Sequence, residues 1–298
     1  MEIQSSPIPL QPINDAVTKK HDVSLFVLRL DLNHPHISGN KLFKLKYNLE
    51  EARKQGKNTL LTFGGAYSNH IAATAAAGKE AGFKTIGIIR GEEHEELNPT
   101  LKFATDCGMQ LFYVSREDYR NKNIQSLSNY QIIKSSNYYL IPEGGSNELG
   151  VLGCKEITKN IPIDFDIVCC PCGTGATLAG IVLSLKDNQN TLGFQILKGE
   201  NYIKSEVDNW LNKFNFITQN KYNINESYHF GGYAKVNPEL KEFIKQFEKE
   251  NNIPLDYVYT GKMMFGIYEL IKKGNFEKGE TIIAIHTGGL QGNKGFEG

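Results

Sequence analysis

The feature that most constrains the fold of this chain is a regular alternation of short apolar runs with longer stretches of helical periodicity. Short runs rich in Val, Ile and Phe are typical of strands, and apolar residues three or four positions apart are typical of helices. Strands joined by helices pair in parallel, and a parallel sheet is covered by helices on both faces. The predicted strands are 59–63, 85–90, 110–114, 138–141, 165–170, 192–197 and 281–286, with a further strand-like run at 25–32.

The helices predicted between these strands carry end signals. Asn98-Pro99 and Asn237-Pro238 each combine a capping residue with a proline at the first helical position, and Gly82 is a typical helix-ending glycine. Residues 198–232 are polar and Asn-rich, and no pattern assigns them. The predicted helices begin at or near 41, 68, 98, 147, 177, 237 and 262.

The alternation occurs in two series, which suits a chain of 298 residues because domains have roughly 100–200 residues each. We therefore predict two three-layer αβα domains with mainly parallel, twisted sheets. Residues 1–45 and 146–298 are expected to form the larger domain, and residues 46–145 the smaller one.

Charge and cysteine content exclude several function classes. The chain has 33 basic and 33 acidic residues, so it offers no electrostatic attraction for nucleic acid or an anionic membrane. No run approaches the roughly 20 apolar residues of a membrane span, and no secretory signal is recognisable. Five cysteines without a disulfide-like spacing indicate a reducing cytoplasm. Cys169 and Cys172 form a C-x-x-C pair, but no second pair completes a zinc site, so no metal is expected.

Nucleotide-binding fingerprints are absent. The glycine-rich run from Gly173 places Leu178 where a dinucleotide-binding motif needs its third glycine, and no phosphate-loop motif occurs. These absences argue against dinucleotide enzymes and phosphate-loop ATPases.

Lys41 is the first candidate for chemistry. Gly39 allows a tight turn and Asn40 is a good helix cap, so Lys41 is expected in the first turn of a helix. An amine held there, near buried surface, should have a lowered pKa. A neutral lysine amine can add to an aldehyde, although most lysines at such positions are solvated. The apolar face of this helix would comprise Leu42, Leu45, Leu49 and Ala52.

Two glycine-containing segments join predicted strands to helices. In Cys172–Thr177, glycines expose backbone N–H groups, threonines add hydroxyls and a helix begins, which together favour binding of one phosphate over a plain turn. In Gly64–His70, Ser68 can cap the helix or help to bind a substrate carboxylate. Asn69 can donate to an oxygen of a cofactor ring, and His70 is either a ligand contact or an ordinary polar helix residue.

Two further segments follow strands or precede helices. Thr287 follows an apolar strand and would lie in the crevice where open α/β sheets bind ligands. Its hydroxyl can bond a pyridine nitrogen. Tyr259 precedes the predicted helix at 262 and can act as an acid, a base or a nucleophile, although most tyrosines only pack.

This ordered set of segments resembles the fold-type II, tryptophan synthase β-like pyridoxal-phosphate enzymes. More narrowly, the chain resembles the 1-aminocyclopropane-1-carboxylate deaminase and D-cysteine desulfhydrase family. The match covers nearly the whole chain, and the order of the motifs is more specific than any one of them. The matching segments are Ser38-Gly39-Asn40-Lys41 with Lys44, Gly64-Gly65 with Ser68-Asn69-His70, Gly173 to Thr177, Gly232-Tyr233, Tyr259-Thr260-Gly261-Lys262 and His286-Thr287-Gly288-Gly289.

The resemblance implies a role for each matching residue. Lys41 would join pyridoxal 5′-phosphate covalently and act as the catalytic base. Ser68, Asn69 and His70 would contact a small amino-acid substrate, with Asn69 also near the cofactor's phenolic oxygen, and Tyr233 and Tyr259 would flank that substrate. The cofactor phosphate and pyridine nitrogen would be bound by Gly173, Thr174, Gly175, Ala176 and Thr177, and by Thr287.

Two reactions compete within the family. The family pattern for cyclopropane deaminases places a glutamate after the Tyr259-type tyrosine, a leucine at the Thr287-type position and a glutamine at the His70-type position. This chain has Thr260, Thr287 and His70, which favours β-elimination from D-cysteine over ring opening. A non-catalytic protein that binds pyridoxal phosphate is a further alternative, and the resemblance also implies a homodimer.

Overall fold

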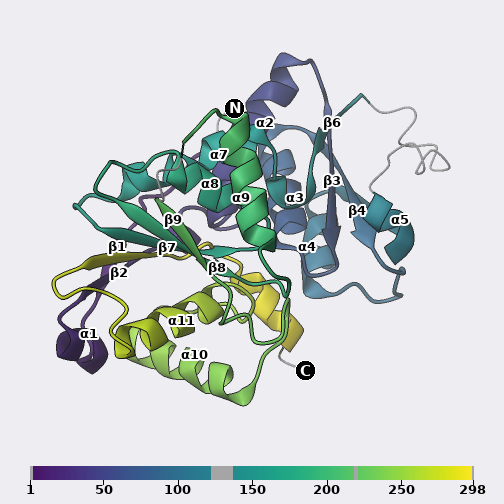
Figure 1. Cartoon of the computed structure of the whole chain (residues 1–298). Helices are drawn as coiled ribbons and strands as arrows, with labels where there is room; N and C mark the ends of the chain where they lie inside the picture. Colours follow the sequence, from purple (N-terminus) through teal and green to yellow (C-terminus); the bar gives the residue numbers. More distant parts are fainter. Residues whose placement is uncertain (1–2, 122–136, 218–220, 297–298) are drawn as a thin grey trace.

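The computed structural model describes residues 3–121, 137–217 and 221–296, and within them the chain forms two sheets (Figure 1). The larger sheet has the order β1-β2-β10-β7-β8-β9 and the smaller one β5-β4-β3-β6. The strands are β1 Leu10–Ile13, β2 Ser24–Leu28, β3 Thr59–Gly65, β4 Lys84–Arg90, β5 Met109–Val114, β6 Tyr138–Ile141, β7 Ile167–Cys172, β8 Asn190–Gln195, β9 Tyr222–Asn225 and β10 Thr281–Ile285. The α-helices are α1 Ala16–His21, α2 Asn40–Lys54, α3 Asn69–Ala81, α4 Pro99–Asp106, α5 Arg116–Asn121, α7 Glu148–Cys154, α8 Ala176–Val182, α9 Tyr202–Lys213, α10 Pro238–Asn251 and α11 Thr260–Lys272.

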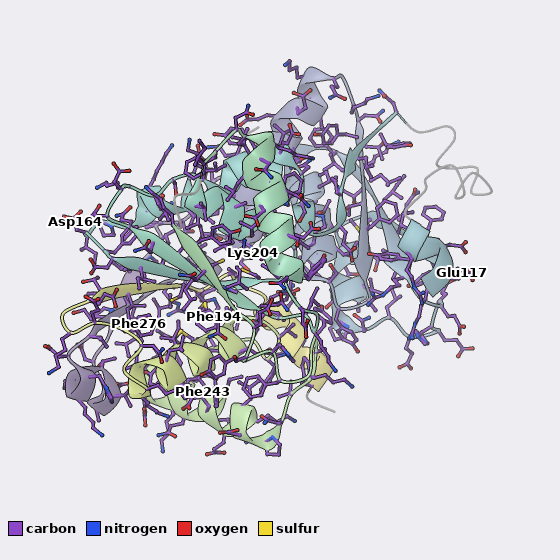
Figure 2. All side chains as sticks on the ribbon, in the orientation of Figure 1. Glu117, Asp164, Phe194, Lys204, Phe243 and Phe276 are labelled. Atoms are coloured by element: carbon purple, nitrogen blue, oxygen red, sulfur yellow. The ribbon has the colours of Figure 1, made fainter. Side chains whose placement is uncertain are left out.

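The larger sheet is buried on both faces. Helices α7, α8 and α9 lie on one side of it in Figure 1, and α1, α10 and α11 lie on the other. Each face has its own apolar core, which explains why β7 is apolar along nearly its whole length. Only β1 runs antiparallel to its neighbour among these strands. In Figure 2, Phe194 lies in the interior near α11, whereas Asp164 and Glu117 lie at the periphery.

The smaller sheet is wholly parallel among its described strands. Alanine-rich α3 packs closely on it because small side chains let the helix approach, and a Cβ at Gly78 would come within 2.2 Å of the Thr85 side chain. The fold class predicted from the alternation of strands and helices is confirmed. The exact domain boundaries at 45 and 146 stay a prediction.

Most helix-end signals act as expected. Asn98, Asn147 and Asn237 each accept N–H bonds in the first turn of their helix, and Gly82 ends α3 in the left-handed region with φ 78°. No helix in the described part of the chain is both long and apolar enough to cross a bilayer.

Two predicted elements differ from the structure, and one stretch without a prediction contains regular structure. The run 25–32 is a strand only to Leu28 and continues as a 3₁₀ turn, because Arg29 departs from extended backbone to pair with Asp31. The helix predicted to begin near 147 is expected to continue to Lys159, but α7 ends at Cys154 and a 3₁₀ turn follows at Ile157–Asn160. The unassigned stretch 198–232 contains α9 and β9. In α9 the buried residues Ile203, Val207 and Leu211 recur every four positions, so the helical periodicity is present in the sequence and was missed.

Close contact between α2 and α7 fixes the helix that carries Lys41. A Cβ at Gly153 of α7 would lie 1.9 Å from the Phe43 carbonyl oxygen of α2, and a Cβ at Gly180 of α8 would lie 2.5 Å from the Val151 oxygen. Backbone therefore packs directly on backbone at both crossings. The start of α2 is held against the larger sheet's helices rather than against solvent.

We expect Gly153→Ala to lower the free energy of unfolding by about 1–3 kcal/mol or more, because the new methyl group overlaps backbone that cannot rotate away. Leu152→Ala is the matched control, since Leu152 is the neighbouring residue of α7 and is 36% exposed. Urea titration of both variants measures the difference. Equal midpoints for the two variants would contradict this account of the crossing.

Candidate active site

A cavity of about 810 Å³ opens where strands of both sheets end. Gly65 and Arg90 follow or close strands of the smaller sheet, and Gly173, Leu197 and Thr287 follow strands of the larger one. The sequence-predicted residues gather here, with the exception of Ala176, which is fully buried at the start of α8. Those that line the cavity are Lys41, Ser68, Asn69, His70, Gly173, Thr174, Gly175, Thr177, Tyr233, Tyr259 and Thr287.

Lys41 reaches the cavity because two distant segments touch. Gly39 has φ 73°, and a Cβ there would lie 1.9 Å from the Thr287 carbonyl oxygen. The Asn40 N–H donates to that oxygen at 3.3 Å. Buried Asn33 holds the turn on both sides, since its amide donates to the Gly39 oxygen at 3.0 Å and accepts from the Gly39 N–H at 3.1 Å. Only glycine fits this crossing.

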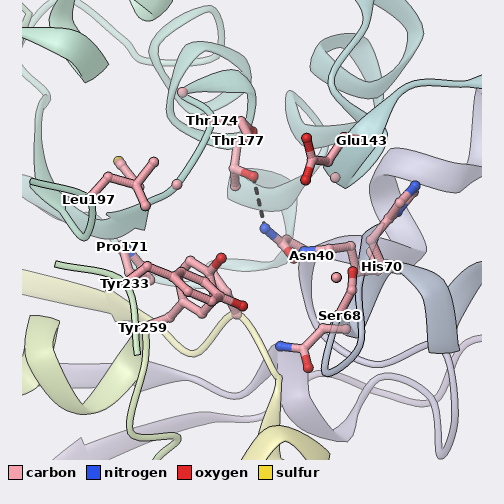
Figure 3. Close-up of a pocket in the computed structure, with 18 of the residues that line it drawn as sticks. Asn40, Ser68, His70, Glu143, Pro171, Thr174, Thr177, Leu197, Tyr233 and Tyr259 are labelled. Atoms are coloured by element: carbon pink, nitrogen blue, oxygen red, sulfur yellow. Dashed lines mark hydrogen bonds between the residues drawn. The ribbon is translucent and has the colours of Figure 1, made fainter. Parts of the chain in front are cut away.

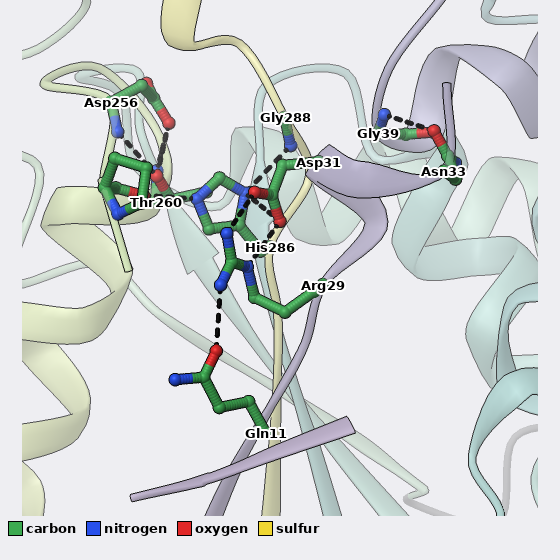
Figure 4. Close-up of polar contacts among 10 residues, drawn as sticks. Gln11, Arg29, Asp31, Asn33, Gly39, Asp256, Thr260, His286 and Gly288 are labelled. Carbon is green, nitrogen blue, oxygen red and sulfur yellow. Dashed lines mark hydrogen bonds and ion pairs between the residues drawn. The ribbon is translucent and has the colours of Figure 1, made fainter. Parts of the chain in front are cut away.

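The turn at Thr287 is held from behind by a buried polar network (Figure 4). His286 donates through Nε2 to the Pro254 oxygen at 2.7 Å and accepts the Gly288 N–H through Nδ1 at 3.2 Å. Asp31 lies 3.4 Å from that Nδ1 and forms a two-point ion pair with Arg29. Both ring nitrogens of His286 are thereby hydrogen-bonded to backbone, and these bonds stabilise the conformation of the turn after β10.

Asn40 does not cap α2, which corrects the sequence interpretation. It is the first helical residue, and Gly39 occupies the cap position. Its side chain instead bridges the site, because Nδ2 donates to Thr177 Oγ1 at 2.9 Å (Figure 3) and Oδ1 accepts from Lys41 Nζ at 2.8 Å. The glycine-rich loop and the lysine are thus joined through one amide.

The Lys41 amine is easily deprotonated. Burial first, and then the positive charge of Lys44, lower its pKa to about 7. Lys44 is itself 3% exposed, donates to the Gly144 oxygen at 2.9 Å, and has a pKa lowered by burial. At neutral pH a large share of the Lys41 amine is therefore an uncharged nucleophile.

The glycine-rich loop presents backbone to the cavity. Gly175 has φ 72° and packs against α9, where a Cβ would lie 3.1 Å from the Glu206 side chain. It stands at the start of α8, and no side chain caps the first N–H groups of that helix. Thr174 and Ser146 share a hydrogen bond at 2.6 Å. The arrangement offers N–H and O–H donors to an anion.

The second loop has divided roles. Ser68 caps α3 by accepting the Ile71 N–H at 3.3 Å, and Asn69 accepts from Gln291 at 2.6 Å, which leaves its Nδ2 as a donor. His70 is 2% exposed, and its Nε2 pairs with Thr62 at 2.8 Å. Burial and the nearby Lys41 and Lys44 keep the pKa of His70 well below its ordinary value, so the ring is neutral. Figure 3 shows this ring directed away from the two tyrosines.

Tyr233 and Tyr259 face the cavity together. Their rings meet edge to face with centroids 6.2 Å apart. Burial raises the pKa of both phenols, so each is a hydroxyl donor at neutral pH. Thr260, in contrast, is fully buried and bonded to Asp256, whose carboxylate also accepts the Tyr259 N–H at 2.6 Å.

Several charged residues of the wall were not selected from sequence. Arg90 lies over the Tyr119 ring with its guanidinium carbon 5.6 Å from the centroid, and Tyr119 donates to Glu143 at 2.7 Å. Arg116 and Arg120 also line the cavity. Cations therefore outnumber carboxylates there, which favours anionic ligands. A single arginine after a strand carries no motif, so sequence offered only its position.

The described residues contain no group of three or more His, Cys, Asp or Glu that could hold a metal. Cys169 and Cys172 both lie in β7, and burial raises the pKa of the Cys169 thiol.

A family model described as "Pyridoxal-phosphate dependent enzyme" matches residues 3–288, so the chain belongs to the pyridoxal-phosphate dependent enzymes. Among them, its relatives define the 1-aminocyclopropane-1-carboxylate deaminase and D-cysteine desulfhydrase family. An Arabidopsis thaliana protein named "Bifunctional D-cysteine desulfhydrase/1-aminocyclopropane-1-carboxylate deaminase, mitochondrial" is 31% identical over 90% of this chain and 73% of its own. A Thermotoga maritima protein provisionally named 1-aminocyclopropane-1-carboxylate deaminase is 30% identical over 98% and 96%.

Structure comparison agrees with these relatives. A solved structure of an ACC deaminase homologue superposes with a TM-score of 0.84 at 28% identity, covering 98% of this chain and 92% of that one. The resemblance of this chain to the family, inferred from six motifs, is thus confirmed, and so is the predicted cofactor, pyridoxal phosphate.

The residues present fit that cofactor. Lys41 supplies the amine, and Asn40 links it to the glycine-rich loop, where Gly173, Gly175 and the hydroxyls of Thr174 and Thr177 line the cavity. Thr287 lies at the cavity wall with 8% exposure. The individual roles of these residues stay predictions.

We expect capture of pyridoxal phosphate by the cofactor-free protein to accelerate as pH rises through about 7 and then to level off, because only the neutral amine of Lys41 adds to the aldehyde. Lys44→Met should move this midpoint upward, since it removes the neighbouring positive charge that lowers the Lys41 pKa. Borohydride trapping followed by peptide mass analysis measures the rate at Lys41.

Lys46→Met is the control, because Lys46 lies on the same helix with its side chain 46% exposed and bonded to Glu156. A Lys44→Met midpoint equal to that of Lys46→Met would show that Lys44 does not set the reactivity.

Proposed function

We propose that the protein is a D-cysteine desulfhydrase that converts D-cysteine and water to pyruvate, ammonia and hydrogen sulfide by β-elimination. Membership of the family and a bifunctional relative support this reaction class. The observation that carries the proposal is the reactive amine of Lys41, whose pKa is lowered to about 7, within a cavity rich in cations and hydroxyl donors.

When bound, pyridoxal phosphate supplies an electron-withdrawing ring that makes the substrate's Cα proton acidic. In this proposal the Lys41 amine takes that proton and holds it. The positive charge of Lys44 lowers the pKa of the Lys41 amine, so Lys41 gives up the abstracted proton again easily.

The substrate carboxylate is assigned to the loop at the start of α3. Ser68 and the free Nδ2 of Asn69 offer donors there, and Arg90 lies nearby, with Nη2 3.7 Å from where a Cβ of Gly65 would be. An anion at this position gains hydrogen bonds and opposite charge together. The contact of His70 with substrate stays a prediction. Its Nε2 is bonded to Thr62, so this nitrogen is not available to a substrate.

The departing thiolate is assigned to the tyrosine side of the cavity. Tyr259 and Tyr233 keep their protons at neutral pH, so either hydroxyl can donate to sulfur as negative charge develops. Such a donor favours elimination because a hydrogen bond stabilises the negative charge that develops on the departing sulfur.

Ring opening of 1-aminocyclopropane-1-carboxylate to 2-oxobutyrate and ammonia is the alternative, supported by the names of the relatives. The family pattern places a glutamate after the Tyr259-type residue in such deaminases. Here that position is Thr260, which is fully buried and absent from the described cavity wall. This favours the desulfhydrase reaction.

A further alternative is a protein that binds pyridoxal phosphate without turnover. A homodimer and a cytoplasmic location also stay predictions.

We expect the purified protein, supplied with pyridoxal phosphate, to release sulfide and pyruvate in equal amounts from D-cysteine. Lys41→Ala should lower kcat by about 10²–10⁴-fold and remove the borohydride-sensitive visible absorbance, because it deletes both the covalent link and the base. Lys46→Ala should retain both properties.

The same assay separates the alternatives. Release of 2-oxobutyrate from the cyclopropane acid without sulfide from D-cysteine would identify a deaminase. An absorbance band without product from a panel of D- and L-amino acids would identify a binding protein. Turnover that survives Lys41→Ala would refute the assignment of the base.

A further inference from the structure

Lys262 is a buried cation outside the proposed chemistry. It lies on α11 with 0% exposure, and no described carboxylate forms an ion pair with it. Its Nζ donates to two backbone oxygens, that of His229 at 2.9 Å and that of Gly232 at 2.7 Å. Burial of an ammonium group with only carbonyl partners is costly, so the contacts it makes need a reason.

The two oxygens belong to a strained loop. Phe230, Gly231, Gly232 and Ala234 all have φ between 54° and 117°. A left-handed backbone is costly for the two residues that are not glycine and persists only where surrounding contacts impose it. Within the loop, the described backbone bonds are Gly232 N–H to the His229 oxygen at 3.0 Å and Lys235 N–H to the Gly232 oxygen at 3.2 Å.

Lys262 therefore adds a charge-assisted bond to each of the two turns of this loop. Carbonyl oxygens have two lone pairs, so each can accept from Lys262 and from a loop N–H together. The Gly232 oxygen matters most, because it belongs to the peptide unit that joins Gly232 to Tyr233. Fixing that peptide plane fixes the position of the Tyr233 Cα and so restricts the directions that the Tyr233 side chain can take.

Tyr233 is 43% exposed and borders the cavity beside Tyr259, whose ring it meets edge to face. Tyr259 stands immediately before α11, three residues ahead of Lys262. One helix thus presents Tyr259 directly and holds Tyr233 through an ammonium group.

An apolar contact also holds the loop. Phe230 meets Phe265 of α11 edge to face with centroids 5.1 Å apart. This contact anchors the first half of the loop but does not orient the peptide before Tyr233. The two anchors therefore have different effects that an experiment can separate.

We propose that Lys262 is a positioning residue that orients the Gly232–Tyr233 peptide, so that Tyr233 lies beside Tyr259 on the same wall of the substrate cavity. The proposal rests on the proposed function only in that Tyr233 borders the bound substrate.

Lys262→Met tests this assignment, because it keeps the length of the side chain and removes the ammonium group. We expect amide hydrogen exchange in residues 229–235 to accelerate roughly tenfold or more, as loss of charged hydrogen bonds favours loop opening. KM for D-cysteine should rise by a similar factor, with a smaller change in kcat and a retained cofactor band. The control is Lys272→Met on the same helix, where the side chain is 52% exposed and pairs with Glu269.

A double variant distinguishes positioning from general stability. If Lys262 acts through Tyr233, then Lys262→Met combined with Tyr233→Ala should have the KM of Tyr233→Ala alone. KM increases that multiply would overturn the proposal, as would unchanged exchange in Lys262→Met.

If Lys262→Met does not fold, Lys262→Gln is the second variant, because it keeps a neutral hydrogen-bond donor. Amide exchange in residues 229–235 should then be faster than in the wild type but slower than in an unprotected loop. Exchange as slow as in the wild type would overturn the proposal. If the protein releases no sulfide from D-cysteine, the proposed function fails, and the exchange measurement still decides whether Lys262 holds the loop.

Discussion

The contact between Gly39 and the Thr287 backbone is the constraint on which the site depends. It joins the start of α2 to the end of the last strand, and it tolerates no Cβ. Asn33 holds one side of the crossing and His286 holds the other, both through buried hydrogen bonds. Because the crossing is rigid, Lys41 is presented at the carboxyl ends of the strands, where both sheets contribute loops.

The electrostatics of the cavity follow from this placement. Burial lowers the pKa of both amines, Lys41 and Lys44, and the positive charge of Lys44 lowers that of Lys41 further. Burial has the opposite effect on the tyrosines, which keep their protons. The same removal from water therefore supplies a base on one wall and hydroxyl donors on the other. Such a division suits proton abstraction at one carbon and departure of a leaving group from the next.

Local signals were reliable where local interactions decide the outcome. Asn98 and Asn237 cap their helices as expected because a cap involves residues only two or three positions away. Asn40 has the same residue type in a similar context, but its Oδ1 accepts from Lys41 Nζ and its Nδ2 donates to Thr177, 137 residues away, so its side chain bridges the site instead of capping α2. Helix α9 was missed although Ile203, Val207 and Leu211 recur every four positions, the spacing of a helix whose one face packs on the core of the larger sheet.

The sequence by itself determined the fold class, the family and the cofactor, and it singled out Lys41 as the candidate for the reactive lysine. These follow from periodicity and from motifs whose residues are neighbours in the chain. Only the tertiary structure decided that Arg90 faces the cavity, that His70 bonds to Thr62 and that Lys262 holds the Tyr233 loop. Burial, hydrogen bonding and pKa depend on which distant residues meet, and a linear pattern does not specify those meetings.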